Sequence, residues 1–530
     1  MSLARNTAVQ ASLTLGSRIL GFARDLFLAQ RFGQGPLMDA FTTALMAPNL
    51  FRRLFAEGAF AQAFVPVYGR VKAEDGDQAA EVAASQSLSF LTFVVVVFCI
   101  VAQVAMPWIM PFLLSAYRDQ AEVLRLATFA TQLAMPYLAC MAVASLLSGV
   151  LNTGGRFALS AGVPVLLNVC TIAPLLVVQD RETALLAVSA AVTLAGVLQA
   201  GVLWWGVRRL GVRLRIDWPK LYPVVKRVLA LAVPGALAGG ATQLNSLTSQ
   251  VLTGSDAGAR SVLYNADRLY QLPLGLVGVA IGLALVPRLT RAFVGGDHEG
   301  ARKTVDDGVA LAMAFTLPAA AALLVAPFFI IDATVTRGAF TSADAARTAD
   351  VLTHFAWGVP AFVLAKVFTP PFFARQDMRR PMNYAVTSVI VNIALGASLY
   401  FGLDALGYDG VVGLAIATST AAWLNVALLC WTLGREGVWS PGAAVTGRLL
   451  RIGAATGLMA AALGACAYFY PELSRLLWRK EVAVLAGVAV GGLVYAAAAL
   501  GLKAVTPGEL RAALRREKGA GPAGAAVDLG

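Results

Sequence analysis

Long apolar stretches separated by short polar connections dominate the pattern of this chain. Residues 87–114, 184–206 and 482–500 are nearly free of charge. Each of them is about 20 residues or longer, which is the length that an α-helix needs to cross the hydrocarbon core of a bilayer. The pattern predicts an all-α integral membrane protein.

About fourteen candidate spans follow one another along the sequence. They lie near residues 7–32, 37–65, 85–114, 123–152, 157–178, 184–206, 226–254, 262–287, 305–331, 348–372, 382–402, 411–433, 449–470 and 481–502. The connections between them are too short for an independently folded soluble domain. We therefore expect the function to lie inside the helix bundle.

Composition agrees with this interpretation. Hydrophobic residues make up 58% of the chain and charged residues only 14%, against about a quarter charged in soluble domains. The segment 7–32 is too long and too rich in arginine for a signal peptide, so we keep it in the mature protein. The five cysteines and two histidines show no ligand spacing, so we expect neither a metal site nor a disulfide.

The distribution of basic residues predicts the orientation. If the number of spans is even, the two ends and the connections on their side hold 26 of the 42 lysines and arginines, the opposite connections 10 and the spans six. Because basic residues accumulate on the cytoplasmic side, both termini are predicted to be cytoplasmic. The net charge of +12 is then largely a topology signal and gives no case for nucleic-acid binding. The stretch 208–215 is interpreted as a surface that faces anionic lipid.

The first twelve spans contain an internal repeat at a nearly constant separation. Val65, Pro66, Arg70, Gly76 and Asp77 recur as Val286, Pro287, Arg291, Gly296 and Asp297, and Pro136, Arg156 and Asn168 recur as Pro360, Arg380 and Asn392. Six spans in each half make both halves enter the membrane from the same side. This predicts two six-helix lobes in a parallel pseudo-repeat, as in transporters that move two lobes about a central site.

The repeat divides the chain into five predicted parts. They are an N-terminal lobe at 1–206, a cytoplasmic linker at 207–225, a C-terminal lobe at 226–433, a final helix pair at 434–502 and a cytoplasmic tail at 503–530.

Charged residues inside the predicted spans are candidates for function, because a charge at the bilayer centre costs at least about 2.5–3.5 kcal/mol. They are Arg18, Arg24, Asp25, Asp39, Arg52, Arg53 and Glu57 in the first half, and Asp267, Arg268 and Lys366 in the second. Internal pairing explains some of them, since Arg53 and Glu57 are four residues apart and Lys366 can reach a span end. Once Asp25 and Asp39 have partners, positive charge remains in excess. Arginine binds phosphate through a planar fork of donors, so we favour an anion site over packing alone.

At these residues the sequence resembles the MurJ (MviN) lipid II flippases of the multidrug/oligosaccharidyl-lipid/polysaccharide exporter superfamily. The resemblance rests on SRILGFARD at 17–25, MDAF at 38–41, PNLFRRLFAEGAFAQAFVP at 48–66, LNTGGRF at 151–157, YNADRLYQLPLG at 264–275 and FFARQDMRRP at 372–381. It implies fourteen helices, with two six-helix lobes around a cavity and a last pair that forms a groove for a lipid tail.

The resemblance also implies a function, and it is not an enzymatic one. Lipid II, an undecaprenyl diphosphate that carries a disaccharide-pentapeptide, would be moved from the inner to the outer leaflet of the bacterial cytoplasmic membrane for cell-wall synthesis. The implied substrate-binding residues are Arg18, Arg24, Arg52, Arg268 and Asp39, with Asp25, Arg53, Glu57 and Asp267 in support. The implied partners are lipid II and membrane lipids, with other cell-wall synthesis or division proteins as further candidates.

No cofactor is expected, and the membrane potential is the expected driving force. Relatives that bind sodium do so between the seventh, eleventh and twelfth spans, which here contain Asn245, Asn392, Thr418 and Asn425 but no acid; this disfavours a sodium site. The chain has no P-loop pattern. An empty, positively charged cavity would be drawn back inward by an inside-negative potential.

Two alternatives stay open. One is a polysaccharide-lipid flippase or another exporter of the same superfamily, although a drug antiporter should use acids for coupling and should lack surplus arginine. The other is a membrane-embedded enzyme acting on polyprenyl phosphates. Such an enzyme needs an acid cluster for a metal, or a nucleophile with a base, and neither is visible.

Overall fold

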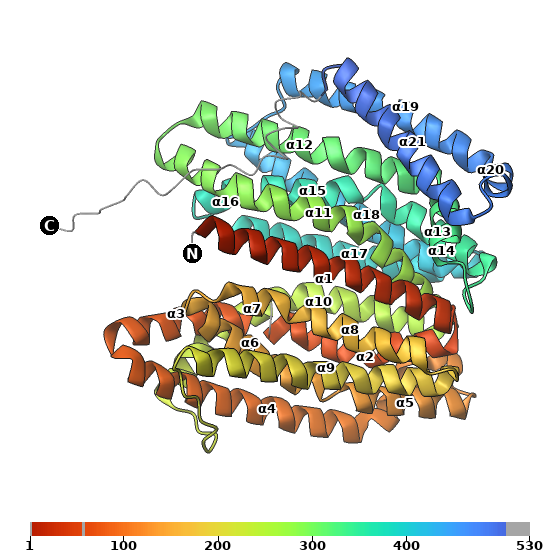
Figure 1. Ribbon diagram of the computed structural model, residues 1–530. Coiled ribbons are helices and arrows are strands. Elements are labelled where there is room, and N and C mark those ends of the chain that lie inside the picture. The colour runs from red at the N-terminus through yellow and green to blue at the C-terminus, as the bar shows by residue number, and fades with distance from the viewer. Residues whose placement is uncertain (1–2, 56–58, 505–530) are drawn as a thin grey trace. The chain divides into compact units, whose positions relative to one another are not determined.

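The computed structural model describes residues 3–55 and 59–504, which form helices joined by short connections, with no strand among them (Figure 1). The helices are α1 (Leu3–Phe32), α2 (Pro36–Phe55), α3 (Ala59–Glu74), α4 (Gly76–Leu113), η1 (Ser115–Tyr117), α5 (Ala121–Ala134), α6 (Tyr137–Thr153), α7 (Phe157–Gly162), α8 (Pro164–Val177), α9 (Arg181–Arg209), α10 (Pro223–Leu252), η2 (Thr253–Ser255), α11 (Ala259–Val294), α12 (His298–Val325), α13 (Pro327–Val335), α14 (Ser342–Ala356), α15 (Val359–Phe368), α16 (Pro370–Ala374), α17 (Arg379–Ala405), α18 (Gly410–Arg435), α19 (Ala443–Tyr468), α20 (Tyr470–Leu476) and α21 (Lys480–Gly501).

Each predicted span coincides with one helix or with a run of consecutive helices. Within the described part of the chain, ten of these stretches are long and apolar enough to cross a membrane. This confirms the all-helical class and makes the chain a multi-pass membrane protein. The other four predicted spans coincide with α1, with α2 and α3, with α10 and with α11, and the total of fourteen stays a prediction.

Four spans that the sequence predicts as continuous are broken, and the breaks lie at prolines. They fall at Pro136 between α5 and α6, at Pro164 between α7 and α8, at Pro327 between α12 and α13, at Pro360 between α14 and α15, and at Pro370 between α15 and α16. Proline has no N–H to donate, and its ring clashes with the preceding turn, so a helix tends to end before it and a new one to begin.

Two of the repeated positions take similar local structure in both halves. Gly76 and Gly296 have positive φ angles of 87° and 69° at the turns that lead into α4 and α12, a conformation that glycine adopts without a steric penalty. Pro136 and Pro360 both lie at the start of the second helix of a broken span. These matches support the internal repeat.

Contacts divide the chain into two compact units. The first consists of Met1–Leu269, Thr334–Val351 and Ala385–Ala421, and the second of Tyr270–Ala333, Leu352–Tyr384 and Ala422–Gly530. The two lobes and the other boundaries predicted from the repeat stay predictions.

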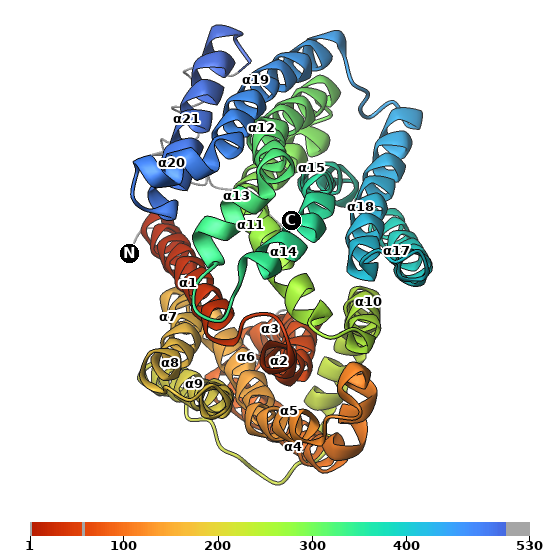
Figure 2. The same ribbon diagram turned by 90° about the vertical axis from the view of Figure 1, so that its right-hand side faces the viewer.

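The first unit is a bundle whose helices run roughly along one common direction (Figures 1 and 2). Helix α9 packs against α5, α6 and α8, α1 packs against α7 and α8, and α10 packs against α3 and α4. Its core is continuous and is built from Leu, Val, Ala and Met side chains, with the rings of Phe41, Phe64 and Tyr117 fully buried among them.

The predicted linker is extended and runs alongside α4. The backbone N–H groups of Arg213, Arg215 and Asp217 donate to Glu81 Oε1, Ser85 Oγ and Ser89 Oγ at 2.9–3.0 Å. These acceptors lie one helical turn apart, which matches the two-residue spacing of donors along an extended chain. Buried Leu214 fixes this segment to the first unit.

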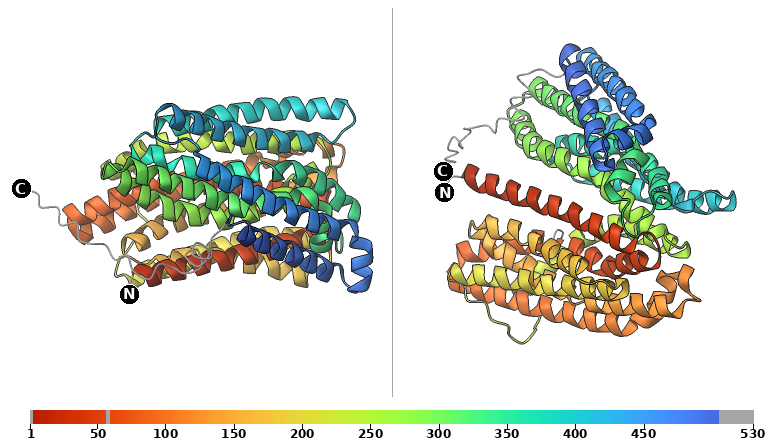
Figure 3. Two further views of the ribbon diagram at one scale, coloured as in Figure 1. Left: turned by 90° about the horizontal axis from the view of Figure 1, so that it is seen from above. Right: turned by 45° about the vertical axis from the view of Figure 1, so that its right-hand side comes forward.

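The second unit includes the final helix pair. Helix α19 packs against α12 and α21 (Figure 3). A buried carboxylate fastens the pair to α13: Asp332, 3% exposed, accepts hydrogen bonds at Oδ2 from Tyr470 Oη at 2.7 Å and from Lys480 Nζ at 2.8 Å. The Tyr470 ring packs edge-on against Phe329 at 5.0 Å between centroids.

Candidate functional site

Two arginines from different helices share one carboxylate in the first unit. Arg24 and Asp25 lie on α1, and Arg268 lies on α11. Arg24 donates to Asp25 Oδ1 from Nε at 3.0 Å and from Nη2 at 2.7 Å, and Arg268 Nε lies 3.5 Å from Asp25 Oδ2. We call these three residues, with Asn168 and Tyr264, the arginine cluster.

Tyr264 connects the two helices. Its hydroxyl donates to Asp25 Oδ1 at 2.9 Å, and its ring lies under the Arg268 guanidinium, with Cζ 4.7 Å from the ring centroid. Tyr264 is one helical turn before Arg268 on α11, so the two side chains project from the same face. A cation over an aromatic face is held electrostatically, which keeps the guanidinium in place without using its hydrogen-bond donors.

Asn168 on α8 completes the cluster. Its Oδ1 accepts from Arg24 Nη1 at 3.2 Å, while its Nδ2 donates to the Ser17 carbonyl at 2.9 Å. The amide therefore fixes the Arg24 guanidinium relative to the backbone of α1. From the sequence, Asn168 could be assigned only a place in the repeat.

The two arginines differ in the donors that they leave available. The Arg24 side chain is 12% exposed and its nitrogens are engaged by Asp25 and Asn168. The Arg268 side chain is 33% exposed, and its Nε has no hydrogen-bond partner among the described residues. An anion therefore reaches the more exposed Arg268 side chain more readily, whereas Arg24 gains free donors only when Asp25 releases it.

The other predicted site residues are placed as follows. Arg18 is exposed, and Asp267 interacts electrostatically with Arg268. Arg24 and Arg268 are thus balanced by two carboxylates, and Arg18 on the same helix as Arg24 adds one positive charge. The side chains of Arg52 and Arg53 lie outside the described residues, as does Glu57.

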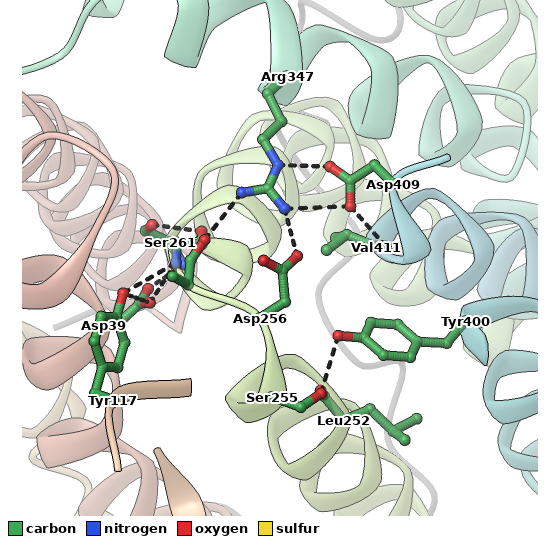
Figure 4. A network of polar contacts seen from close by, with 12 residues as sticks. Asp39, Tyr117, Leu252, Ser255, Asp256, Ser261, Arg347, Tyr400, Asp409 and Val411 are labelled. Atoms are coloured by element: carbon green, nitrogen blue, oxygen red, sulfur yellow. Dashed lines mark hydrogen bonds and ion pairs between the residues drawn. The ribbon is translucent and has the colours of Figure 1, made fainter. Parts of the chain in front are cut away.

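Asp39 lies outside the arginine cluster and accepts hydrogen bonds from a different set of groups. It is 1% exposed, at the start of α2. Tyr117 Oη and the Gly258 N–H both donate to Oδ2 at 2.8 Å, and the Ser261 N–H donates to Oδ1 at 2.9 Å (Figure 4). We call these four residues the Asp39 cap, because the carboxylate satisfies free N–H groups at the N-terminus of α11.

A buried arginine lies beside the cap. Arg260, 2% exposed, donates to Thr43 Oγ1 at 2.5 Å and to the carbonyls of Leu113 at 2.6 Å and Gln250 at 2.5 Å. Its charge interacts with that of Asp39. The guanidinium therefore joins α2, α4 and α10, and the carboxylate compensates a cation that burial would otherwise disfavour.

These contacts gather several chain connections at one end of the first unit. The turn after α1 meets the segment before α14, where Ala339 N–H donates to the Gln30 carbonyl at 2.7 Å. Gln34 Nε2 donates to the Asp344 carbonyl at 2.9 Å, and Ser115 Oγ donates to the Gly254 carbonyl at 3.3 Å. All of these connections follow odd-numbered predicted spans, so their meeting at one end agrees with spans that alternate in direction.

Three comparisons place the chain among known proteins. A family model described as lipid II flippase MurJ matches residues 28–481. The probable lipid II flippase MurJ of Rhizobium meliloti (strain 1021) is 38% identical over 525 residues, which cover 97% of each chain. The lipid II flippase MurJ of Burkholderia cenocepacia is 32% identical over 450 residues, covering 83% of this chain and 86% of the relative.

Solved structures agree on the fold. A structure titled lipid II flippase MurJ, inward closed conformation, has a TM-score of 0.76 at 21% identity and covers 96% of this chain and 100% of its own. An inward-facing multidrug resistance MATE family transporter of the MOP superfamily has a TM-score of 0.63 at 12% identity, covering 83% of this chain and 98% of its own.

Proposed function

Because the chain belongs to the lipid II flippase MurJ family, we propose that it moves lipid II from the inner to the outer leaflet of the bacterial cytoplasmic membrane. The observation that carries this proposal is the family match along nearly the whole chain, together with an arginine cluster at the residues that the motifs single out. Both termini lie in the cytoplasm in this proposal, since basic residues concentrate on their side. Transport, rather than a chemical reaction on the lipid, is the function.

The arginine cluster holds the diphosphate of the substrate in this proposal. Arg268 offers a guanidinium whose side chain is 33% exposed, and Arg24 offers a more buried one that is neutralised by Asp25. A diphosphate carries two charged groups and can replace the carboxylate on both arginines at once. Asp25 then acts as an internal counter-ion that occupies the arginines while the substrate is absent. Arg18 and Arg52 add positive charge to the same site.

The Asp39 cap closes one end of the transport path in this proposal. Alternating access requires each end to close in turn around the substrate. The cap joins the start of α2 to the start of α11, and the connections around it follow odd-numbered spans. With cytoplasmic termini, these connections face the periplasm, so the cap closes the periplasmic end. The final helix pair, α19 and α21, holds the lipid tail.

Depletion of the protein in its own bacterium tests the function. We expect lipid II to accumulate in the inner leaflet, because synthesis continues while export stops. The measurement is the fraction of lipid II that a membrane-impermeant reagent can reach on intact spheroplasts. Unchanged access to lipid II would contradict the proposal, and accumulation of a different polyprenyl-linked saccharide would identify the chain as another exporter of the superfamily.

The membrane potential is expected to set the direction of transport. The positive excess of the empty site is drawn inward by an inside-negative potential, and moving one charge through the potential is worth about 2.3 kcal/mol per 100 mV. Collapse of the potential by an ionophore at constant ATP should therefore slow flipping. Undiminished flipping would leave lipid synthesis and consumption as the source of direction.

A further inference from the structure

Arg347, near the start of α14, joins separate connections of the first unit (Figure 4). Its Nε donates to Asp409 Oδ2 at 2.6 Å, its Nη2 donates to Asp256 Oδ2 at 2.6 Å, and its Nη1 donates to the Ala257 carbonyl at 3.2 Å. All three nitrogens are engaged, and the side chain is 31% exposed. We call Arg347, Asp256 and Asp409 the Arg347 network.

We propose that Arg347 is a positioning residue of the transport cycle, which sets the turn before α11 so that its amides reach Asp39. The role in transport rests on the proposed function, whereas the effect on the turn does not. The network would then stabilise the closed form of this end.

The turn before α11 transmits the effect of Arg347 to Asp39. Arg347 holds the side chain of Asp256 and the carbonyl of Ala257, and the next residue, Gly258, donates its N–H to Asp39. Gly258 has a φ angle of +80°, and a Cβ there would lie 3.4 Å from Arg347 Nη1. The turn thus needs glycine for its backbone conformation, and the guanidinium packs against it directly.

Further contacts fix the same turn and the partners of Arg347. Asp409 Oδ1 also accepts from the Val411 N–H at 3.0 Å at the start of α18, so this carboxylate is itself held in place. Ser255 Oγ lies 3.2 Å from Tyr400 Oη on α17. Gln34 Nε2 donates at 2.5 Å to Oγ1 of Thr348, the residue after Arg347. The start of α14 is therefore connected to the turns after α1, α10 and α17.

The chemistry of the network requires arginine. One planar guanidinium meets two carboxylates and a carbonyl from different directions, which a lysine ammonium on a flexible stem does not reproduce. A basic residue is also unusual at this end, since the connections on this side hold few of them. Opening would separate these connections, and the hydrogen bonds of Arg347 would then be lost together.

Cysteine labelling at Ser261 measures opening without any substrate. Ser261 is fully buried in the Asp39 cap. The change Ser261→Cys keeps the backbone N–H that donates a hydrogen bond to Asp39. The reporter is placed in a chain whose five native cysteines are replaced, after its Tm has been shown to match that of the unmodified chain, and is labelled with a water-soluble maleimide in nanodiscs. Arg347→Gln should raise the labelling rate about tenfold or more, because the loss of one hydrogen bond to a charged group, about 1.5 kcal/mol, already corresponds to about tenfold.

Arg118→Gln is the matched control. Arg118 is an exposed arginine directly after Tyr117 and should leave the labelling rate unchanged. Asp256→Asn should raise the labelling rate. In the double variant Arg347→Gln/Asp256→Asn, the added Asp256→Asn change should raise the rate by a smaller factor than it does alone, since both changes remove the same interaction. Equal rates in Arg347→Gln and Arg118→Gln would overturn the proposal.

A folding control separates opening from unfolding. A second chain retains only native Cys99, which is buried on α4. Its labelling should stay slow in Arg347→Gln, and a parallel rise at Cys99 would show a general loss of structure and overturn the positioning role. If labelling at position 261 responds as expected while lipid II export proves absent, the positioning role stands and the proposed function fails.

Discussion

Replacement of Arg268 by alanine is expected to abolish lipid II flipping while the chain still folds and inserts. The Arg268 side chain is a third exposed, and Asp25 keeps its shorter ion pair with Arg24 at 2.7 Å when Arg268 is lost, so the chain should still fold. Two charged hydrogen bonds to a phosphate group are worth about 3 kcal/mol or more, which corresponds to a loss of about 100-fold or more in rate. The measurement is flipping in spheroplasts or proteoliposomes, with protein level and Tm determined in parallel.

Arg268→Lys should restore only part of the activity, because an ammonium is a point charge without the planar fork. Arg125→Ala is the matched control, since Arg125 is exposed on α5 and should tolerate the change. Arg24→Ala should also stop flipping but should lower Tm as well, since it removes the shorter of the two ion pairs of buried Asp25. Full flipping in both alanine variants would show that these charges serve only packing.

Asp39→Leu should open the end of the first unit that the Asp39 cap closes. The change leaves Tyr117 Oη and the amides of Gly258 and Ser261 without their acceptor, and it leaves the buried Arg260 charge uncompensated. Removal of one partner of a buried charged pair costs about 3–5 kcal/mol. Labelling at Ser261→Cys should therefore rise about 100-fold or more, and flipping should stop, because the cycle needs this end to close.

Asp39→Asn should have a smaller effect on labelling, since an amide oxygen in the place of Oδ2 still accepts two of the three hydrogen bonds. The labelling also decides between two roles for Asp39. The resemblance to the flippase family places Asp39 among the substrate-binding residues, whereas its contacts place it at the N-terminus of α11. Lost flipping with unchanged labelling would favour direct contact with the substrate and would argue against the cap.

The arginine cluster could be predicted in large part from the sequence. Arg24, Asp25 and Arg268 are charges in apolar spans, and the cost of such charges indicates a function. The partner of Asp25 could not be predicted, because helical spacing puts Arg18 on the same face, whereas the long side chain of neighbouring Arg24 bends to reach the carboxylate. Asn168 and Tyr264 are common residue types, and only the fold shows what they contact.

The sequence contains fewer indications of the Asp39 cap and of the Arg347 network than of the arginine cluster. Two of the donors to Asp39 are backbone amides, which every residue except proline carries, so no residue type marks them. One signal was present: Arg260 and Arg347 are basic residues on the side where few are expected. Each proves to be held by several acceptors. The breaks in the helices could be predicted from the prolines. However, Pro174 and Pro318 lie inside unbroken helices, so a proline alone does not predict a break.

The contacts of Asp332 limit how this chain can change during evolution. The final helix pair lies outside the internal repeat, so a shorter ancestor could have lacked it. In the present chain, loss of the pair would remove Tyr470 and Lys480, which both donate to the buried Asp332 carboxylate. Loss of these two donors from a buried carboxylate would destabilise α13, so deletion of the pair carries a cost in stability. An added segment that supplies the partners of an older residue becomes hard to lose, even if its original advantage disappears.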